Sequence, residues 1–247
     1  MTNEDAIPAA TLIVMRDVAA GLPELLMVTR TRSMAFAGGA MVFPGGRVDA
    51  QDHLGNHDLD DAAARIAAIR ETLEESGLPV AMQPLPSPDA AVRLRHALHE
   101  GAPLAGLFAT HGLALDLHAL TPFARWKPAF KQPRKFDTLF YLAEAPPGDW
   151  LLTPQPGECE SVEWATAAAV LDRIAEGSAT AIFPTIRNLE RLALFSSLAD
   201  ARTQAAAHPV ETITPWIEEE DGVKWLRIPD HLGYPVTRER LSDAMRA

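Results

Sequence analysis

The sequence predicts an α/β fold in which helices cover a mixed β-sheet. Residues 10–18 and 25–29 are rich in Leu, Ile and Val and lie on either side of a Gly-Leu-Pro turn, so they predict a β-hairpin. Residues 123–126 and 136–143 have the composition of two further strands. Between these two groups, an amphipathic helix that stops at Gly77 can pack its apolar side on the sheet.

Acidic side chains are concentrated on one side of this helix. Glu71 and Glu75 are four residues apart and Glu74 is three residues from Glu71, so all three carboxylates project from one side. Like charges at this spacing repel each other unless a counterion lies between them. A divalent cation is the simplest counterion, and oxygen ligands suit magnesium or manganese. The opposite side of the helix is apolar and carries Ile66, Ile69 and Leu73.

A glycine turn precedes the helix. Residues 41–43 predict a short strand that leads into a Pro-Gly-Gly turn. Because glycine has no side chain, a backbone carbonyl of Gly45 or Gly46 can face a metal ion. The helix itself is expected to begin after an N-cap at Asp58 or Asp60.

The length and charge of the chain restrict its function. Its 247 residues fit one elaborated α/β domain with additions. The 22 Lys and Arg residues against 33 Asp and Glu residues give a net charge of −11, which argues against a broad nucleic-acid surface. A small phosphorylated substrate is compatible with this charge, because metal ions can bridge carboxylates and phosphate oxygens.

The expected location is the cytoplasm. Cys159 is the only cysteine, so no intrachain disulfide can form and a reducing compartment fits. Residues 1–5 lack the basic and apolar regions of a signal peptide, and no stretch is long enough to predict a transmembrane helix. The sequence also does not end in a peroxisomal Ser-Lys-Leu signal. We therefore expect no membrane partner.

The stretch from the glycine turn to the end of the helix resembles the signature of the Nudix hydrolases. That signature runs Gly, five residues, Glu, seven residues and then Arg-Glu-x-x-Glu-Glu-x-Gly with an apolar residue. Its second half matches at Arg70, Glu71, Glu74, Glu75, Gly77 and Leu78. Its first half differs, because Asp52 stands where Glu is expected and the loop before Arg70 is about ten residues longer (70 minus 60).

The wider sequence is similar to the coenzyme A diphosphatase branch of this family, and most to its acyl-CoA type. The similar residues are 32–36, 42–49, Asp52 and 134–138. The resemblance implies a Nudix-type α/β/α sandwich with a mixed sheet, formed as a single domain over residues 8–247.

Two segments are expected to extend this domain. Residues 84–120 predict a helical insertion of two Ala/Leu-rich helices that starts at a Ser-Pro-Asp sequence. After a short helix at 166–176, residues 184–247 predict a C-terminal extension. It consists of a long helix over 184–207 and a hairpin over 212–228.

Several cationic residues are candidates for substrate binding. Arg30 and Arg32 follow the predicted hairpin, where they can clamp phosphate or form a solvated charged loop; the sequence favours neither interpretation. A polyphosphate substrate needs positive charge, although such a cluster is by default a solvated loop. The densest positive cluster is Lys127, Lys131, Arg134 and Lys135.

The acidic helix supplies the chemistry that we expect. Mg²⁺ or Mn²⁺ held by Glu71, Glu74, Glu75 and the Gly46 carbonyl would neutralise diphosphate oxygens and activate a water molecule. A carboxylate would then accept the proton of that water. The candidates are Glu71, Glu74 and, from a distant loop, Glu160 or Glu158. The resemblance implies that Arg70 orients a neighbouring Glu.

The resemblance also implies a substrate. Coenzyme A or an acyl-CoA is favoured, with a phosphopantetheine fragment and an adenosine bisphosphate as products. ADP-ribose, another nucleotide-sugar, a dinucleotide or a nucleoside triphosphate is the alternative within enzymes. A non-catalytic Nudix-like module that binds a nucleotide ligand is the alternative from another class. A homodimer is compatible with such folds, but no residue in the sequence argues for it.

Overall fold

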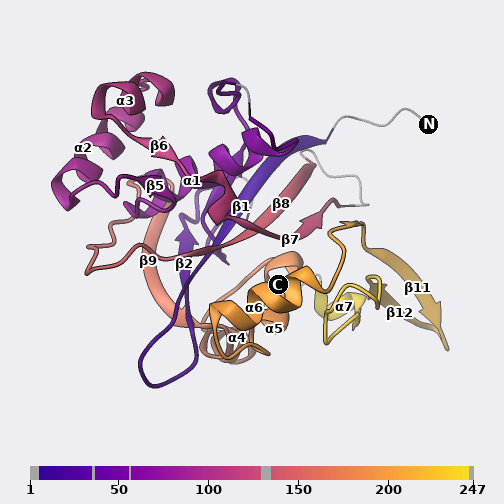
Figure 1. Ribbon diagram of the computed structural model, residues 1–247. Coiled ribbons are helices and arrows are strands. Elements are labelled where there is room, and N and C mark those ends of the chain that lie inside the picture. Colours follow the sequence, from indigo (N-terminus) through magenta and orange to yellow (C-terminus); the bar gives the residue numbers. More distant parts are fainter. Residues whose placement is uncertain (1–5, 35–36, 56, 129–134, 245–247) are drawn as a thin grey trace.

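The computed structural model describes residues 6–34, 37–55, 57–128 and 135–244. At its centre is an eight-stranded mixed sheet with helices on both faces (Figure 1). Strand β1 (Ile7–Arg16) is an inner strand of this sheet and pairs in parallel with β8 (Phe136–Glu144). Its other edge is shared by two antiparallel strands, β2 (Glu24–Arg30) and β4 (Gly45–Arg47).

The outer strands complete the sheet. On one side, β7 (Thr121–Trp126) pairs with β8, and β10 (Thr212–Ile213) pairs with β7. On the other side, β3 (Met41–Val42) and β9 (Cys159–Thr166) pair with β2. The predicted N-terminal hairpin and the two later strands are therefore confirmed.

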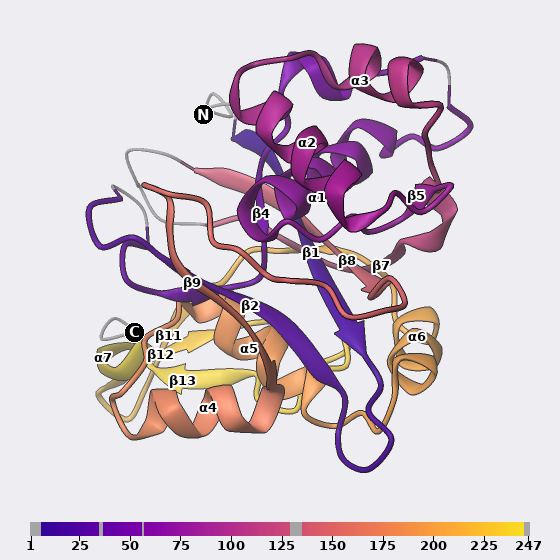
Figure 2. The same ribbon diagram turned by 90° about the vertical axis from the view of Figure 1, so that its left-hand side faces the viewer.

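Each face of the sheet has its own hydrophobic core. Successive residues of a strand point to opposite faces, so Leu12 and Val14 of β1 contribute to one core and Ile13 and Met15 to the other. The Leu12 core is covered by α1 (Ala62–Ser76), α2 (Pro88–His99) and α3 (Leu104–His111). The Ile13 core is covered by α4 (Ala167–Ala175), α5 (Phe183–Leu192) and α6 (Leu198–Ala206). Figure 2 shows these two helical layers above and below the strands.

Helix α1 ends as predicted but begins differently. Gly77 follows its last residue with a left-handed φ of 81°, which confirms the expected stop. The N-cap is Asp61, so the prediction of Asp58 or Asp60 was wrong. The Asp61 carboxylate does not cap the helix, because it instead accepts hydrogen bonds from Arg65 and from the Tyr141 hydroxyl.

The long helix predicted over 184–207 is two helices, α5 and α6. The chain turns at Phe195, whose side chain is buried in the Ile13 core. Ser197 then caps α6, since its side chain accepts a hydrogen bond from the Asp200 N–H. The single-helix prediction was therefore wrong at this break, although the predicted helix at 166–176 is confirmed as α4.

The predicted C-terminal hairpin is also shorter than expected. Residues 212–213 form β10 in the main sheet, and Pro215 separates them from the hairpin strands β11 (Trp216–Glu220) and β12 (Val223–Arg227). A third strand, β13 (Arg238–Arg240), pairs with β12. The remaining short elements are β5 (Met82–Gln83), β6 (Ala114–Leu115), α7 (Leu241–Ala244) and two 3₁₀ turns, Ala50–Asp52 and Leu117–Ala119.

The helical insertion predicted over 84–120 contains α2 and α3, and Pro88 opens α2 after the Ser87 N-cap. The assignment of residues 8–247 to a single domain stays a prediction. Among the described residues, no helix has the length and apolar character needed to cross a membrane.

Candidate active site

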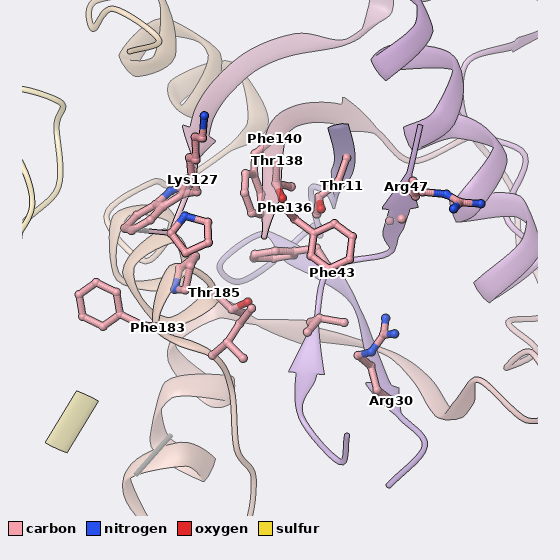
Figure 3. A pocket seen from close by; sticks show the side chains of 18 of the residues that line it. Thr11, Arg30, Phe43, Arg47, Lys127, Phe136, Thr138, Phe140, Phe183 and Thr185 are labelled. Atoms are coloured by element: carbon pink, nitrogen blue, oxygen red, sulfur yellow. The ribbon is translucent and has the colours of Figure 1, made fainter. Parts of the chain in front are cut away.

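A cavity of about 870 Å³ lies over the part of the sheet where β4, β1 and β8 meet. Its floor includes Thr11 of β1 and Thr138 of β8, which Figure 3 shows beside each other. Three carboxylates border it, Glu71, Glu75 and Glu158. Two of these come from the predicted acidic helix, so the helix contributes directly to this cavity.

The carboxylates of Glu71 and Glu75 reach the cavity beside Gly45 and Gly46, which begin strand β4 and do not form the predicted turn. Helix α1 packs on the Leu12 side of the sheet, whereas Thr11 faces the opposite side. The Glu71 carboxylate lies directly against Gly46, where any Cβ atom would overlap it. The Gly45 N–H donates a hydrogen bond to Glu75 Oε2 at 2.9 Å. The missing side chain of Gly46 leaves room for the Glu71 carboxylate, whereas that of Gly45 lets β4 approach the β1 backbone closely.

The strand register distinguishes the two glycines. The Leu12 N–H donates to the Pro44 carbonyl and the Val48 N–H to the Pro8 carbonyl, so the intervening Ala10–Gly46 pair is also at a hydrogen-bonded position. Gly45 lies opposite Thr11 at a non-hydrogen-bonded position, and its N–H points toward Glu75. Because the N–H and carbonyl of one strand residue point the same way, the register favours Gly45 over Gly46 as a carbonyl ligand.

Two of the carboxyl groups that line the cavity, those of Glu71 and Glu75, have raised pKa values. Burial, together with the nearby Glu71 charge, raises the pKa of Glu75 to about 8, although the Gly45 N–H and Arg30 act in the opposite direction. Burial likewise raises the pKa of Glu71 to about 7, against the effect of Arg70. Negative charge on either group is therefore unfavourable, and a cation between them would stabilise the deprotonated carboxylates.

Arg70 connects the loop and the helix. Its buried guanidinium donates from Nε to Asp52 Oδ1 at 2.8 Å and from Nη2 to Asp52 Oδ2 at 3.0 Å. Nη1 donates to Glu71 at 2.9 Å and to Glu74 at 2.7 Å. Burial lowers the pKa of Arg70, but the Asp52 hydrogen bonds and the neighbouring carboxylates outweigh it and raise the pKa above its ordinary value. Asp52 is completely buried, so this pair is shielded from solvent.

Glu74 does not line the cavity. Its carboxylate contacts Arg70, and burial raises its pKa despite that contact. Its backbone carbonyl accepts a hydrogen bond from Arg95 Nε at 2.9 Å and lies 3.2 Å from His99 Nε2, both on α2. The helical insertion thus holds the C-terminal end of the acidic helix.

The structure brings only some of the other predicted residues to the cavity. Arg30 lines it and places Nη1 3.8 Å from Glu75 Oε1. Arg32 is exposed and is not part of the lining; its N–H donates to Glu160 Oε1. Glu160 also does not line the cavity, whereas Glu158 does.

The basic cluster is only partly described. Arg134 and Lys131 lie outside the described residues, so their predicted substrate contacts stay predictions. Lys135 precedes β8 and its carbonyl accepts a hydrogen bond from Ile7, but Lys135 is not among the residues that line the cavity. Lys127, from the same cluster, does line it.

Sequence reasoning missed the apolar part of the cavity. Its lining includes Phe43 from the link between β3 and β4, Phe136 and Phe140 from β8, and Ile182 and Phe183 from the start of α5. These residues belong to segments that are far apart in the sequence. Each is a hydrophobic residue of a type that is common in protein cores. No local signal distinguishes them from the core.

The carboxylate end of the cavity fits a divalent cation chemically. Within the described part of the chain, no group of three or more His, Cys, Asp and Glu side chains converges as a complete metal site. However, Glu71 and Glu75 supply hard oxygen donors whose mutual repulsion needs a counterion, and Gly46 leaves room for the Glu71 carboxylate. Water or substrate oxygens would complete the coordination, as is usual for magnesium.

Comparison with known proteins identifies the family. A Nudix hydrolase of known crystal structure from Alicyclobacillus acidocaldarius is 31% identical, with a TM-score of 0.69, and the match covers 82% of this chain and 97% of that protein. The chain belongs to the Nudix hydrolase family. The expected Nudix-type sandwich is thereby confirmed, and the predicted enzyme is favoured over a non-catalytic module. No family model matches the sequence.

This Nudix hydrolase is also similar to the human acyl-coenzyme A diphosphatase NUDT19. The two are 24% identical over an alignment of 253 positions, gaps included, that covers 78% of this chain. The chain spans 66% of the length of that relative. The predicted resemblance to the acyl-CoA branch is therefore supported by a curated protein of that kind.

Replacing Asp52 should destabilise the protein. In the Asp52→Asn variant the buried Arg70 guanidinium loses its paired carboxylate, so we expect the free energy of unfolding to fall by about 3 kcal/mol. Urea unfolding followed by circular dichroism measures this change. The control is Asp58→Asn, which removes a carboxylate that is 78% exposed and lies beside His118, and should change the stability by less than about 0.5 kcal/mol. Equal stabilities for the two variants would contradict a structural role for the Asp52–Arg70 pair.

Proposed function

We propose that this Nudix hydrolase uses Mg²⁺ or Mn²⁺ to cleave the diphosphate of coenzyme A or of an acyl-CoA. The observation that carries the proposal is the two-part cavity, in which the carboxylates of Glu71 and Glu75 adjoin a large apolar region. A diphosphate joined to a long, weakly polar arm matches such a cavity better than a compact nucleotide. The similarity to the human acyl-coenzyme A diphosphatase supports the same substrate.

The residues at the charged end of the cavity have distinct roles in this proposal. A divalent cation held by Glu71, Glu75 and the Gly45 carbonyl would offset the negative charge of the diphosphate oxygens. Arg30 lies beside Glu75 and adds positive charge at the same end of the cavity. Arg70 keeps Glu71 in position from behind, through its contact with Glu71 Oε1.

Glu158 is our candidate for the proton acceptor. It borders the cavity from the segment before β9 and is exposed, so it can exchange protons with solvent. It would accept the proton of the attacking water while the water oxygen bonds to phosphorus and the bridging P–O bond breaks. The products would be a phosphopantetheine fragment and adenosine bisphosphate. Glu74 and Glu160 are weaker candidates, because neither lines the cavity.

A substrate panel tests the proposal. Purified protein with magnesium or manganese at mildly alkaline pH is incubated with coenzyme A, an acyl-CoA, ADP-ribose, a dinucleotide and a nucleoside triphosphate, and the products are separated by chromatography. We expect cleavage of coenzyme A or its ester in preference to the others. Preference for ADP-ribose or a dinucleotide would keep the Nudix activity and reject the coenzyme A assignment.

The Glu75→Gln variant should lose activity and remain folded. Removing this carboxylate removes a cation ligand, so we expect kcat to fall by roughly 10³-fold or more. The melting temperature should not fall, because the lost charge is buried beside Glu71 and is unfavourable without a cation. The control is Glu219→Gln, on exposed strand β11, which should leave kcat unchanged. Wild-type activity in Glu75→Gln would remove the basis for the proposed cation site.

Stabilisation by the cation should increase with pH. The raised pKa values of Glu71 and Glu75, about 7 and about 8, mean that the folded protein without a cation holds these protons more tightly than the unfolded chain. Their contribution to stability therefore becomes less favourable as pH rises from about 4.5 through 8. A cation binds the deprotonated carboxylates, so the increase in Tm on adding Mg²⁺ should be larger at pH 8.5 than at pH 6. Differential scanning fluorimetry measures both increases, and equal increases would contradict this linkage.

A further inference from the structure

The chemistry of the cavity changes in order across the sheet. The strand order places Gly45 and Gly46 on β4, then Thr11 on β1, then β8 and finally Trp126 on β7. Three strand spacings from β4 to β7 correspond to roughly 14 Å. The β4 end is charged, because Glu71, Glu75 and Arg30 reach it there, whereas the lining toward β7 is mostly apolar and carries one cation, Lys127.

The middle of this path is neither charged nor fully apolar. Thr11 lies opposite Gly45 in the strand register, and Thr138 lies opposite Trp126 on the far side. Both threonines line the cavity and are adjacent in Figure 3. Their hydroxyl groups can donate to and accept from amide groups of a bound molecule.

Residues from the central sheet and from the C-terminal part of the chain line the far end of the path together. Phe140 on β8 and Trp126 on β7 line it from the main sheet, and Ile182, Phe183 and Leu226 line it from elements outside that sheet. The Trp126 ring meets the Phe183 ring edge to face at a centroid distance of 6.0 Å. The five side chains come from three strands and the start of α5, so only the folded chain assembles this wall.

This end offers little to a nucleobase. The Trp126 indole N–H already donates to the Tyr234 hydroxyl at 3.1 Å, and that hydroxyl donates to Asn188 at 2.7 Å. Apart from Lys127 and Thr185, the lining here is apolar, so an adenine ring between Phe140 and Leu226 would leave most of its nitrogen atoms without hydrogen-bond partners. A hydrocarbon chain has no such groups and gains free energy in proportion to its buried area.

From this order we infer that the far end is an acyl subsite, and that Ile182, Phe183 and Leu226 determine the length of acyl chain that the enzyme accepts. The inference rests on the proposed coenzyme A specificity. Diphosphate, amide-bearing arm and acyl chain follow one another in an acyl-CoA, as carboxylates, threonine hydroxyls and apolar side chains follow one another in the cavity.

The test compares free coenzyme A with acetyl-, octanoyl- and palmitoyl-CoA. Because each buried methylene adds favourable free energy, wild-type kcat/KM should rise by at least about tenfold from free coenzyme A to the best long-chain ester. The Ile182→Trp variant fills the subsite from a half-buried position. It should lower kcat/KM for palmitoyl-CoA by about tenfold or more and leave that for free coenzyme A within about twofold. Activity on free coenzyme A also shows that the variant is folded.

The matched control is Val92→Trp on α2. Val92 is 68% exposed and does not line the cavity, so this variant should keep the wild-type chain-length profile. Equal wild-type kcat/KM values for all four substrates, or an equal loss for all four in Ile182→Trp, would overturn the acyl subsite alone. Cleavage of ADP-ribose but of no coenzyme A compound would overturn the proposed function, and the subsite with it.

Discussion

The buried ion pair between Arg70 and Asp52 is the contact on which the site depends. A guanidinium is planar, so a carboxylate bound through Nε and Nη2 fixes the direction of the remaining N–H groups. In this chain those groups meet Glu71 and Glu74. The longer loop between Asp52 and α1 leaves this geometry intact, because the extra residues lie between two points that the ion pair holds together. A surface loop of this kind changes length at little free-energy cost.

The acidic helix and the substrate cavity lie on opposite faces of one sheet. One edge of β1 is shared by β2 and β4, and each of these strands pairs with only part of it. This allows side chains of α1 to reach the other face of the sheet beside β4. The carboxylates reach the cavity beside Gly45 and Gly46 of β4, and the remainder of α1 packs in an apolar core. Burial of the carboxylates raises their pKa values and stores an unfavourable interaction that a cation would release. The buried carboxylates therefore lower the stability of the cation-free protein at the position where we expect a cation to bind.

Local sequence patterns predicted the hairpin and the acidic helix correctly, because periodicity and charge spacing act over a few residues. The break at Ser197 had a local signal, a Ser three residues before Asp200, but the apolar spacing on both sides favoured one helix. The local sequence did not distinguish the two loop candidates, Glu158 and Glu160. The pairing of β2 with β9 shifts register between Thr29 and Arg30, so the two glutamates do not both line the cavity. The apolar wall depends on tertiary packing alone.

The parallel pairing of β1 with β8 has a consequence for how the chain folds. β2 and β4 follow β1 closely in sequence, so one edge of β1 can be paired soon after it is synthesised. The other edge must wait for β8, with the whole acidic helix and the helical insertion in between. Until then β1 presents unpaired backbone groups and apolar side chains, which is the state in which nascent chains associate wrongly. Contacts of such long sequence separation also slow folding, so the formation of this single strand pair is expected to limit the rate at which both cores close.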